Sequence, residues 1–268
     1  MQGWSAIALN TAPDSQNEIH GDQVARQYGF KGGLVPGVTI SAYLAQPAVS
    51  TWGLAWLTGG AAHVRVSSPL YDGERFTVEI TDSNDTRYNA RLTRPDGTVS
   101  ATAEVVLPAE RPTPPVRRFD PVAAPGVIGP AASPEVFRQL QQSGCQAYRY
   151  RWNAEHRMSS YVQDATLMPE LLQASHQGYA NLSFLLGTSN WVLASNALMN
   201  PWVHLETRSQ NFCAVPPDTL VVAEMNVVDF YEKKGHKFVD VEVNLFDDNS
   251  SECLAAIALR AIYQLRGL

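Results

Sequence analysis

The segment from Val38 to Leu57 carries no charged side chain, and it constrains the fold more than any other part of the sequence. Its apolar residues fall on more than one face of a helix, which is typical of a helix enclosed on most sides. Several polar residues and Pro47 interrupt the segment, so it does not resemble a membrane span. Pro47 is expected to kink or divide the helix. The sequence therefore predicts a buried helix that organises the first half of the chain.

The residues after this helix change to the two-residue period of β-strands. Apolar and polar side chains alternate from Ala62 to Leu107, and Asp-Gly pairs at 72–73 and 96–97 mark turns. The alternation predicts three or four antiparallel strands. A buried helix followed by a meander that wraps it is an α+β arrangement.

A stretch rich in proline and alanine divides the sequence into halves of similar length. Such a composition continues neither a sheet nor a helix, and it suits an extended connector. We expect an N-terminal unit over residues 1–110, a linker over 111–134 and a C-terminal unit over 135–268. At the end of the linker, Ser133 is typical of the cap of a short helix that ends near Gly144.

The second half repeats the order of elements seen in the first. A strand-like segment from Tyr148 to Trp152 is followed by a polar loop, a long helical segment from Pro169 to Leu198 and further strands. His204 begins the first of these strands, as His63 begins the first strand after the helix of the other half. An internal repeat of one α+β unit is the simplest interpretation.

Charge and cysteine content exclude several classes of function. The net charge of −6, the pI near 5.5 and the lack of any run of basic residues argue against a nucleic-acid or anionic-membrane surface. Residues 1–16 lack the basic start and apolar core of a secretory signal. The three cysteines are far apart and indicate neither a disulfide framework nor metal-ligand spacing. These features predict a cytoplasmic protein without a metal, a nucleic-acid partner or a membrane partner.

Two chemical resources precede the buried helix. His20, in a polar loop, can accept or donate a proton near neutral pH. The turn from Gly32 to Gly37 leads into the helix, and N–H groups at a glycine-rich helix start can hold a developing oxyanion. A loop histidine is often only a surface or capping residue, and glycines can simply satisfy the backbone angles of a turn. Both interpretations stay open on the residues alone.

These residues resemble the signature of a known family. The runs Asn17-Glu18-Ile19-His20-Gly21-Asp22, Gly29-Phe30 and Gly33-Leu34-Val35-Pro36-Gly37 are similar to motifs of the MaoC-like or (R)-specific enoyl-CoA hydratases, which are hotdog-fold proteins. That family has an Asp-x-Asn-Pro-(Leu/Ile)-His loop, a Gly-Phe pair and a (Leu/Ile)-x-His-Gly turn. The runs from Tyr231 to Val239 and Ala261-Ile262-Tyr263 are similar to its later strands. The resemblance covers essentially the whole chain and implies a double hotdog fold.

The resemblance also assigns roles to individual residues. His20 matches the catalytic histidine and Asn17 the asparagine of the same loop, with Asp14 as the nearest carboxylate. The N–H of the glycine at the helix start would hold the thioester oxygen. The implied substrate-binding residues are Gly33, Val35, Gly37 and Val38.

The sequence departs from the family pattern at three positions. Ser15 stands at the aspartate position, Glu18 replaces the proline, and Pro36 replaces the histidine before the oxyanion glycine. The segment between His20 and Gly29 is also one residue short of the usual spacing. Hydration requires two proton transfers, and with the histidine alone no residue is assigned to one of them.

The function implied by the resemblance is that of a hydratase or dehydratase, a lyase acting on an acyl thioester of CoA or acyl carrier protein without a cofactor. One alternative is an acyl-CoA thioesterase of the same fold, in which Glu170, Asp14 or Asp22 would activate water. Another is a hotdog protein that binds an acyl thioester without turnover.

The second half lacks a matching acidic partner and glycine turn near His156 and His176, so we expect it to be noncatalytic and to supply packing. The remaining histidines, His63, His204 and His236, are expected to be structural or exposed. A homodimer and a pseudo-dimer within one chain are both compatible with the repeat.

Overall fold

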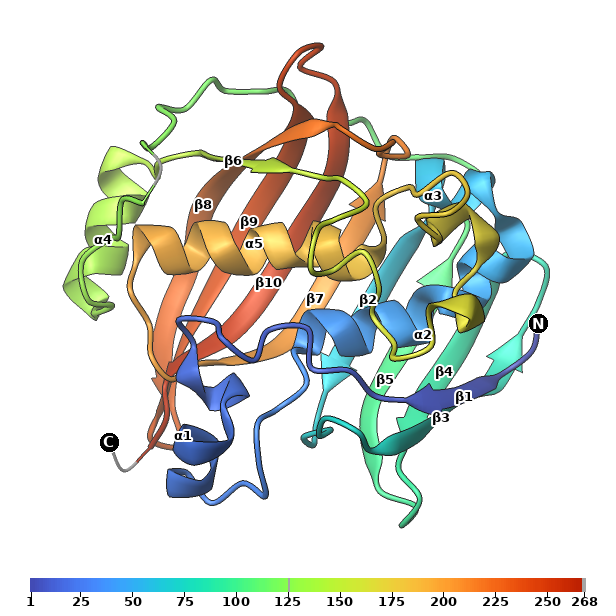
Figure 1. Cartoon of the computed structure of the whole chain (residues 1–268). Coiled ribbons are helices and arrows are strands. Elements are labelled where there is room, and N and C mark those ends of the chain that lie inside the picture. Colours follow the sequence, from blue (N-terminus) through green and yellow to red (C-terminus); the bar gives the residue numbers. More distant parts are fainter. Residues whose placement is uncertain (125, 267–268) are drawn as a thin grey trace.

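The computed structural model describes residues 1–124 and 126–266, which form one ten-stranded sheet that curves around two central helices (Figure 1). The strand order is β1-β3-β4-β5-β2-β7-β10-β9-β8-β6, and every pairing between these strands is antiparallel. The strands are β1 (Trp4–Ile7), β2 (Ala61–Val66), β3 (Arg75–Ser83), β4 (Arg87–Thr93), β5 (Val99–Val106), β6 (Tyr148–Arg151), β7 (Val203–Asn211), β8 (Leu220–Lys233), β9 (His236–Asp247) and β10 (Cys253–Gln264).

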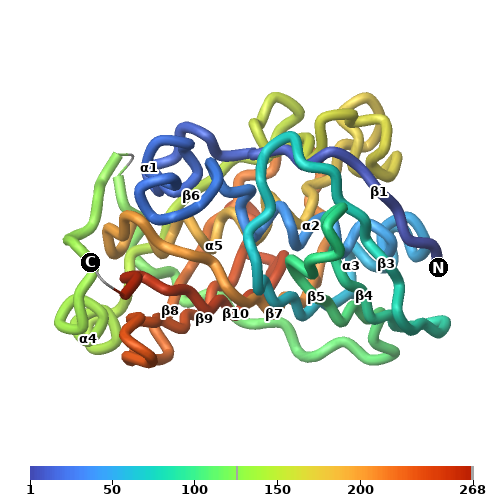
Figure 2. The backbone as a smooth tube through the Cα atoms, turned by 90° about the horizontal axis from the view of Figure 1, so that it is seen from below, coloured from blue at the N-terminus to red at the C-terminus, as the bar shows by residue number. Residues whose placement is uncertain are grey.

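The two central helices lie on one side of this sheet, and loops cover the side of these helices that faces away from the sheet (Figure 2). The α-helices are α1 (Asp22–Gln27), α2 (Gly37–Trp52), α3 (Leu54–Gly59), α4 (Pro134–Ser143) and α5 (Leu182–Asn196). Three short 3-10 turns are η1 (Glu18–His20), η2 (Ala165–Leu167) and η3 (Glu170–Leu172). The expected α+β arrangement, a sheet wrapped round a central helix in each half, is therefore confirmed.

Strands β2 and β7 join the two halves into a continuous sheet. They pair in antiparallel register, with Val64 opposite Thr207 and Arg65 opposite Glu206. The two segments that the sequence marks as corresponding strand starts are thus direct neighbours. Their pairing brings residues of the second half to the start of α2.

Helix α2 continues across Pro47, so the expected division at this residue is not found. Proline has no N–H to donate to the carbonyl four residues earlier, which belongs to Tyr43. The indole N–H of Trp4 donates to that carbonyl instead, at 3.0 Å. The helix ends at Gly53, whose φ of 55° favours glycine.

The prediction of one long helix from Pro169 to Leu198 is wrong for the residues before Leu182. Residues 170–172 form the 3-10 turn η3, and α5 begins only at Leu182. The Asn181 side chain caps α5 by accepting a hydrogen bond from the Phe184 N–H at 3.1 Å. Gly178 lies three residues before this cap, and its φ of 62° is a backbone angle that favours glycine.

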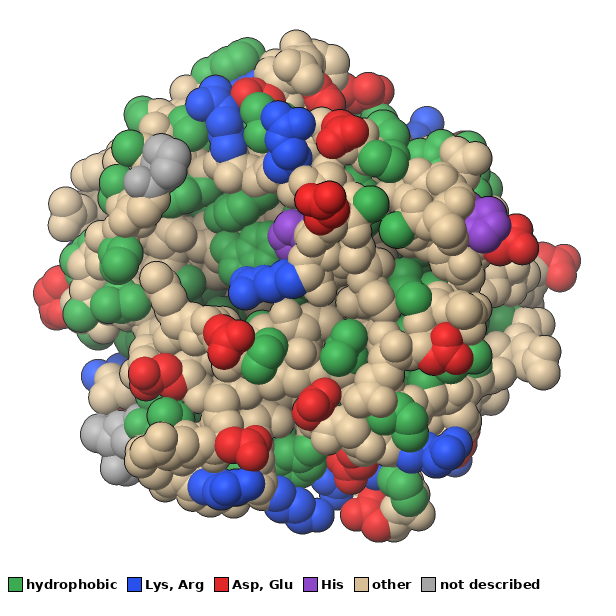
Figure 3. Space-filling model, viewed as in Figure 1, with side chains coloured by type: hydrophobic (Ala, Val, Ile, Leu, Met, Phe, Trp, Pro, Cys, Tyr) green, Lys and Arg blue, Asp and Glu red, His purple; other side chains and the backbone are tan. Residues whose placement is uncertain are grey.

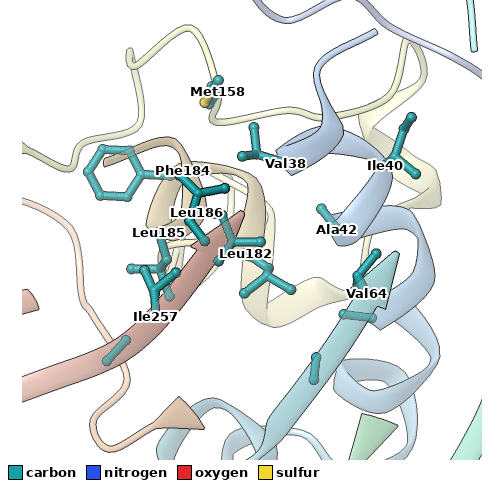
Figure 4. Packing of buried hydrophobic residues seen from close by; sticks show 14 of the residues in the cluster. Val38, Ile40, Ala42, Val64, Met158, Leu182, Phe184, Leu185, Leu186 and Ile257 are labelled. Atoms are coloured by element: carbon teal, nitrogen blue, oxygen red, sulfur yellow. The ribbon is translucent and has the colours of Figure 1, made fainter. Parts of the chain in front are cut away.

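The core lies between the sheet and the two central helices, which pack against each other (Figure 4). Val38 and Ala42 of α2 face Leu182 and Leu186 of α5 in this view. A buried hydroxyl contact of 3.0 Å between Thr39 and Ser183 joins the first turns of the two helices. The first turns of α2 and α5 are therefore adjacent at the centre of the molecule.

Between β5 and α4, the described residues form no helix and no named strand. The buried carboxylate of Glu224 accepts the backbone N–H groups of Arg118 (2.9 Å) and Asp120 (3.1 Å), which fixes this segment to β8. Ser133 caps α4 through the Val136 N–H at 3.2 Å, as the sequence predicts. Within residues 1–124 and 126–266, no helix has the length and apolar character needed to cross a membrane.

Candidate functional site

His20 is held in a single ring orientation by the backbone. Its Nδ1 lies 2.7 Å from the carbonyl oxygen of Leu34, and a carbonyl can only accept a hydrogen bond. Nδ1 therefore carries the proton, and Nε2 of the neutral ring presents a lone pair. The ring is ready to act as a base through Nε2.

Asn17 connects this loop to the second half of the chain. Its Oδ1 accepts the Trp202 N–H at 3.1 Å, and its Nδ2 donates to the Trp202 carbonyl at 2.9 Å. The same Nδ2 lies 3.4 Å from Nε2 of His20. The two bonds to Trp202 fix the amide, so Asn17 offers an N–H to the reactive nitrogen of His20.

The surroundings of His20 favour its neutral form. Burial lowers the pKa of the imidazole, and the positive charge of Arg157 lowers it further. The hydrogen bond to the Leu34 carbonyl opposes this by raising the pKa, but burial is the larger effect. His20 is therefore a neutral base at pH 7.

The start of α2 offers hydrogen-bond donors beside this base. The residue before the helix is Pro36, and no side chain caps the helix start. Within the described chain, the N–H groups of Gly37 and Val38 have no acceptor. The aligned peptide dipoles add partial positive charge at this end of the helix. The arrangement can stabilise an oxygen that becomes negatively charged.

Two cavities meet at the histidine. The larger has a volume of about 270 Å³ and the smaller about 210 Å³. Both are lined by Asn17, His20, Asn190 and Trp202, so these four residues lie where the cavities adjoin. Figure 3 shows a hollow over α5 with hydrophobic side chains at its floor and a basic side chain at its rim. His20 is therefore accessible from both cavities.

Except for Gly33, each residue that the sequence predicts for the site lines one or both of these cavities. Asp14 and Val38 line the larger cavity, and Val35 and Gly37 line the smaller one. Gly33 lines neither, because its N–H donates to the Asp22 carboxylate at 2.8 Å and its α-carbon packs against the carbonyl of His20. Its part is to shape the turn.

Asp14 lies in the same cavity as His20 but is exposed to solvent. No hydrogen bond joins the two side chains among the described contacts, and Asn17 is the neighbour of the reactive nitrogen. The acid and base are thus not a preformed pair in this structure.

Two further carboxylates of the thioesterase alternative lie away from both cavities. Glu170 is exposed on the 3-10 turn η3, so the expectation that it begins the second long helix is wrong. Asp22 is exposed, pairs with Arg26 at 2.9 Å and accepts the Gly33 N–H. Neither lines a cavity that contains His20.

His204 and Asn190 are site residues that the sequence reasoning missed. His204 is buried at the start of β7, and its Nδ1 lies 3.1 Å from Oδ1 of Asn190 on α5. Its ring covers Gly37 so closely that a Cβ there would lie 2.7 Å from Cδ2 of His204. Burial, with a contribution from nearby His20, lowers the pKa of His204 to about 3. This histidine is neutral across the physiological range, and its buried Nε2 has no partner in the described chain.

The start of α5 differs from that of α2. The Asn181 side chain caps α5, whereas no side chain caps α2. Tyr161, from the loop before α5, is buried against α2, and its hydroxyl donates to Oε1 of Gln46 at 2.9 Å. The start of α2 borders both cavities that His20 lines.

No protein-family model matches the sequence, and no curated protein matches it. Solved structures are nevertheless similar in fold. A conserved hypothetical protein from Mycobacterium tuberculosis, described as having a double hotdog fold, is 11% identical with a TM-score of 0.54, over 97% of this chain and 95% of that one. The dehydratase domain of a mycocerosic acid synthase-like PKS is 14% identical with a TM-score of 0.53, over 98% and 91%.

A third similar structure, from Thermobifida fusca YX, is provisionally named a thioesterase II. It is 12% identical with a TM-score of 0.50, over 87% of this chain and 88% of that one. At these identities the likeness concerns the fold alone. The chain therefore has a double hotdog fold, which confirms the predicted architecture.

Proposed function

We propose that this protein is a MaoC-like hydratase or dehydratase of acyl thioesters, with His20 as the acid and base. The observation that carries the proposal is the unprotonated Nε2 of His20, with only the long 3.4 Å contact to Asn17 Nδ2, where it borders both cavities beside the uncapped start of α2. A base and an oxyanion site placed together are what proton transfer next to a thioester carbonyl requires. The dehydratase and thioesterase names among the structural neighbours agree with an acyl thioester as substrate.

The first step of dehydration is removal of a proton from C2 of a 3-hydroxyacyl thioester by His20 Nε2. The electron pair of the C2–H bond forms a C1–C2 double bond, and negative charge moves to the thioester oxygen. The N–H groups of Gly37 and Val38 and the dipole of α2 stabilise that charge. The hydrogen bond from Nδ1 to the Leu34 carbonyl stabilises the imidazolium that forms.

In the second step the thioester carbonyl re-forms and a C2–C3 double bond replaces the C3–O bond. The proton held on Nε2 passes to the departing hydroxyl, which leaves as water. Burial and the charge of Arg157 lower the pKa of His20, so the imidazolium gives up this proton readily. One histidine therefore performs both transfers, and the scheme does not need a carboxylate at Ser15. Hydration is the same sequence in reverse.

The same site supports a thioesterase as the second candidate. His20 would then remove a proton from water as it attacks the thioester carbonyl, with the same N–H groups on the tetrahedral oxygen. Glu170 and Asp22 lie outside the cavities, so the base of this alternative would be His20 or Asp14, which both line the larger cavity. The products differ: hydration leaves the thioester intact, whereas a thioesterase releases a free thiol.

The experiment follows trans-2-butenoyl-CoA and trans-2-hexenoyl-CoA by their enoyl absorbance, with a thiol reagent in parallel and mass spectrometry of the products. We expect the absorbance to fall and the mass to rise by one water, without thiol release. Thiol release with an unchanged acyl mass would favour the thioesterase. No reaction, together with thermal stabilisation by the substrates, would mean that the protein binds acyl thioesters without turnover.

A further inference from the structure

We propose that the larger cavity holds the arm of a phosphopantetheine thioester, that Arg157 binds its phosphate, and that the acyl chain continues past His20 into the smaller cavity. The inference rests on the proposed function for the position of the thioester. It adds the direction in which the substrate lies and the group that recognises its charged end.

The two cavities differ in chemistry. The larger combines apolar side chains, among them Met158, Trp191 and Leu198, with the polar loop residues Asp14, Ser15 and Gln16 and with Arg157, which the smaller cavity lacks. The smaller is lined mainly by apolar side chains from the segment before α2, from α2 itself, from β2 and from the second half, namely Phe30, Leu34, Val35, Ile40, Val66, Val203, Leu205, Ile262 and Leu265. A hydrocarbon chain gains free energy by leaving water for the smaller cavity. A polar, charged arm fits the larger one.

Arg157 is an unpaired cation at the larger cavity. Its side chain is exposed, and it forms no ion pair with any residue of the described chain. Its guanidinium lies over the ring of Trp191 on α5, 5.8 Å from the ring centre. That contact limits the freedom of the side chain and leaves its N–H groups for a ligand. A planar guanidinium is well suited to phosphate oxygens.

The position of His20 determines which part of the substrate lies in each cavity. The histidine lines both cavities, so a thioester near His20 has one end in each. Arg157 and His20 both line the larger cavity, so one ligand in this cavity can contact both side chains. The apolar end then faces the smaller cavity, and the phosphorylated end faces Arg157.

Free CoA and the prosthetic group of an acyl carrier protein share the phosphopantetheine arm. The test uses unreactive hexyl thioethers of pantetheine, of 4′-phosphopantetheine and of CoA, and a carrier protein loaded with the same hexyl thioether. Binding is measured by calorimetry, so catalysis is not needed. Preference for the CoA thioether or for the loaded carrier protein identifies the source.

We expect the phosphopantetheine thioether to bind about tenfold more tightly than the pantetheine thioether, as an exposed charge-assisted contact allows. Arg157→Met, which keeps a chain over Trp191, should abolish this ratio without changing pantetheine binding. Arg138→Met is the matched control. Arg138 is also exposed and lies 5.8 Å from an aromatic ring, that of Phe230, but it lines neither cavity.

The direction of the acyl chain is tested by Val66→Phe, which narrows the smaller cavity. This variant should weaken the hexyl thioether about tenfold and leave the methyl thioether of the same arm unchanged. Equal weakening of both lengths, equal binding of the phosphorylated and phosphate-free thioethers, or no binding of any probe would overturn the proposal. The expected binding pattern without hydration of enoyl-CoA would leave it intact and reject the proposed hydratase instead.

Discussion

Replacement of His204 by glutamine should remove a large part of the acid sensitivity of the fold. The pKa of His204 is about 3 in the folded chain, against an ordinary value of 6.5. Below pH 6.5 the unfolded chain therefore binds a proton at this residue that the folded chain does not. The stabilisation is fully present above pH 6.5 and is lost as the pH falls from 6.5 toward 3.

The size of the effect at pH 5.0 follows from the unfolded state alone, because the folded residue is still neutral there. Protonation of the unfolded histidine costs about 2 kcal/mol of unfolding free energy between pH 7.5 and pH 5.0. His204→Gln cannot take up this proton. The difference in stability between wild type and His204→Gln should therefore shrink by about 2 kcal/mol over this pH interval.

The assay is urea unfolding at both pH values, because urea leaves the ionic strength unchanged. Tryptophan fluorescence and far-UV circular dichroism must give coincident transitions for the free energies to be compared. His176→Gln is the control, since His176 is an exposed histidine outside both cavities. The difference in unfolding free energy between wild type and His204→Gln should change between pH 7.5 and pH 5.0. A change of less than about 0.5 kcal/mol would refute the assignment of a buried neutral histidine.

Three further changes test the site. Gly37→Ala places a methyl group 2.7 Å from Cδ2 of His204, so it should lower stability by about 1–3 kcal/mol in the same urea assay; unchanged stability would show that the ring does not cover Gly37. Asn17→Ala leaves the Trp202 N–H and carbonyl without their buried partner, so it should cost about 1–3 kcal/mol, and a loss below about 0.3 kcal/mol would contradict the described hydrogen bonds. Because burial lowers the pKa of His20, kcat/KM for hydration should stay constant down to pH 6.5 and fall only below it; an inflection above pH 7 would contradict the environment described for this residue.

The sequence predicts the parts of this molecule that depend on local pattern. The uncharged segment after Gly37, the alternation from Ala62 and the cap at Ser133 each act over a few residues, and the structure contains the corresponding elements. The loop with His20 is found for the same reason. A short motif places the histidine and the glycine turn close together along the chain.

The sequence fails where distant segments decide the outcome. Pro47 remains inside α2 because Trp4, far away in the sequence, supplies the donor that the proline lacks. The helix expected from Pro169 begins only at Leu182, because Gly178 with its positive φ and the capping residue Asn181 precede it. The pattern of apolar residues does not reveal either feature. His204 resembles an ordinary strand residue until the pairing of β7 with β2 brings it onto the first turn of α2.

The remaining site residues were hidden for the same reason. Asn190 and Arg157 belong to the second half, whose packing against α2 completes the site from across the repeat. No spacing along the chain links them to His20. A search for polar residues on the central helix of the second half and at the start of the next strand would have suggested Asn190 and His204 as candidates.

The central claim is that His20 transfers the proton at the junction of the two cavities. Its most direct test is kcat/KM for hydration of trans-2-hexenoyl-CoA by His20→Gln, beside His176→Gln and with thermal unfolding to verify the fold. We expect a loss of at least about 100-fold for His20→Gln, as for removal of a general acid-base residue, and none for the control. A folded His20→Gln protein that hydrates the substrate at the wild-type rate would contradict the account.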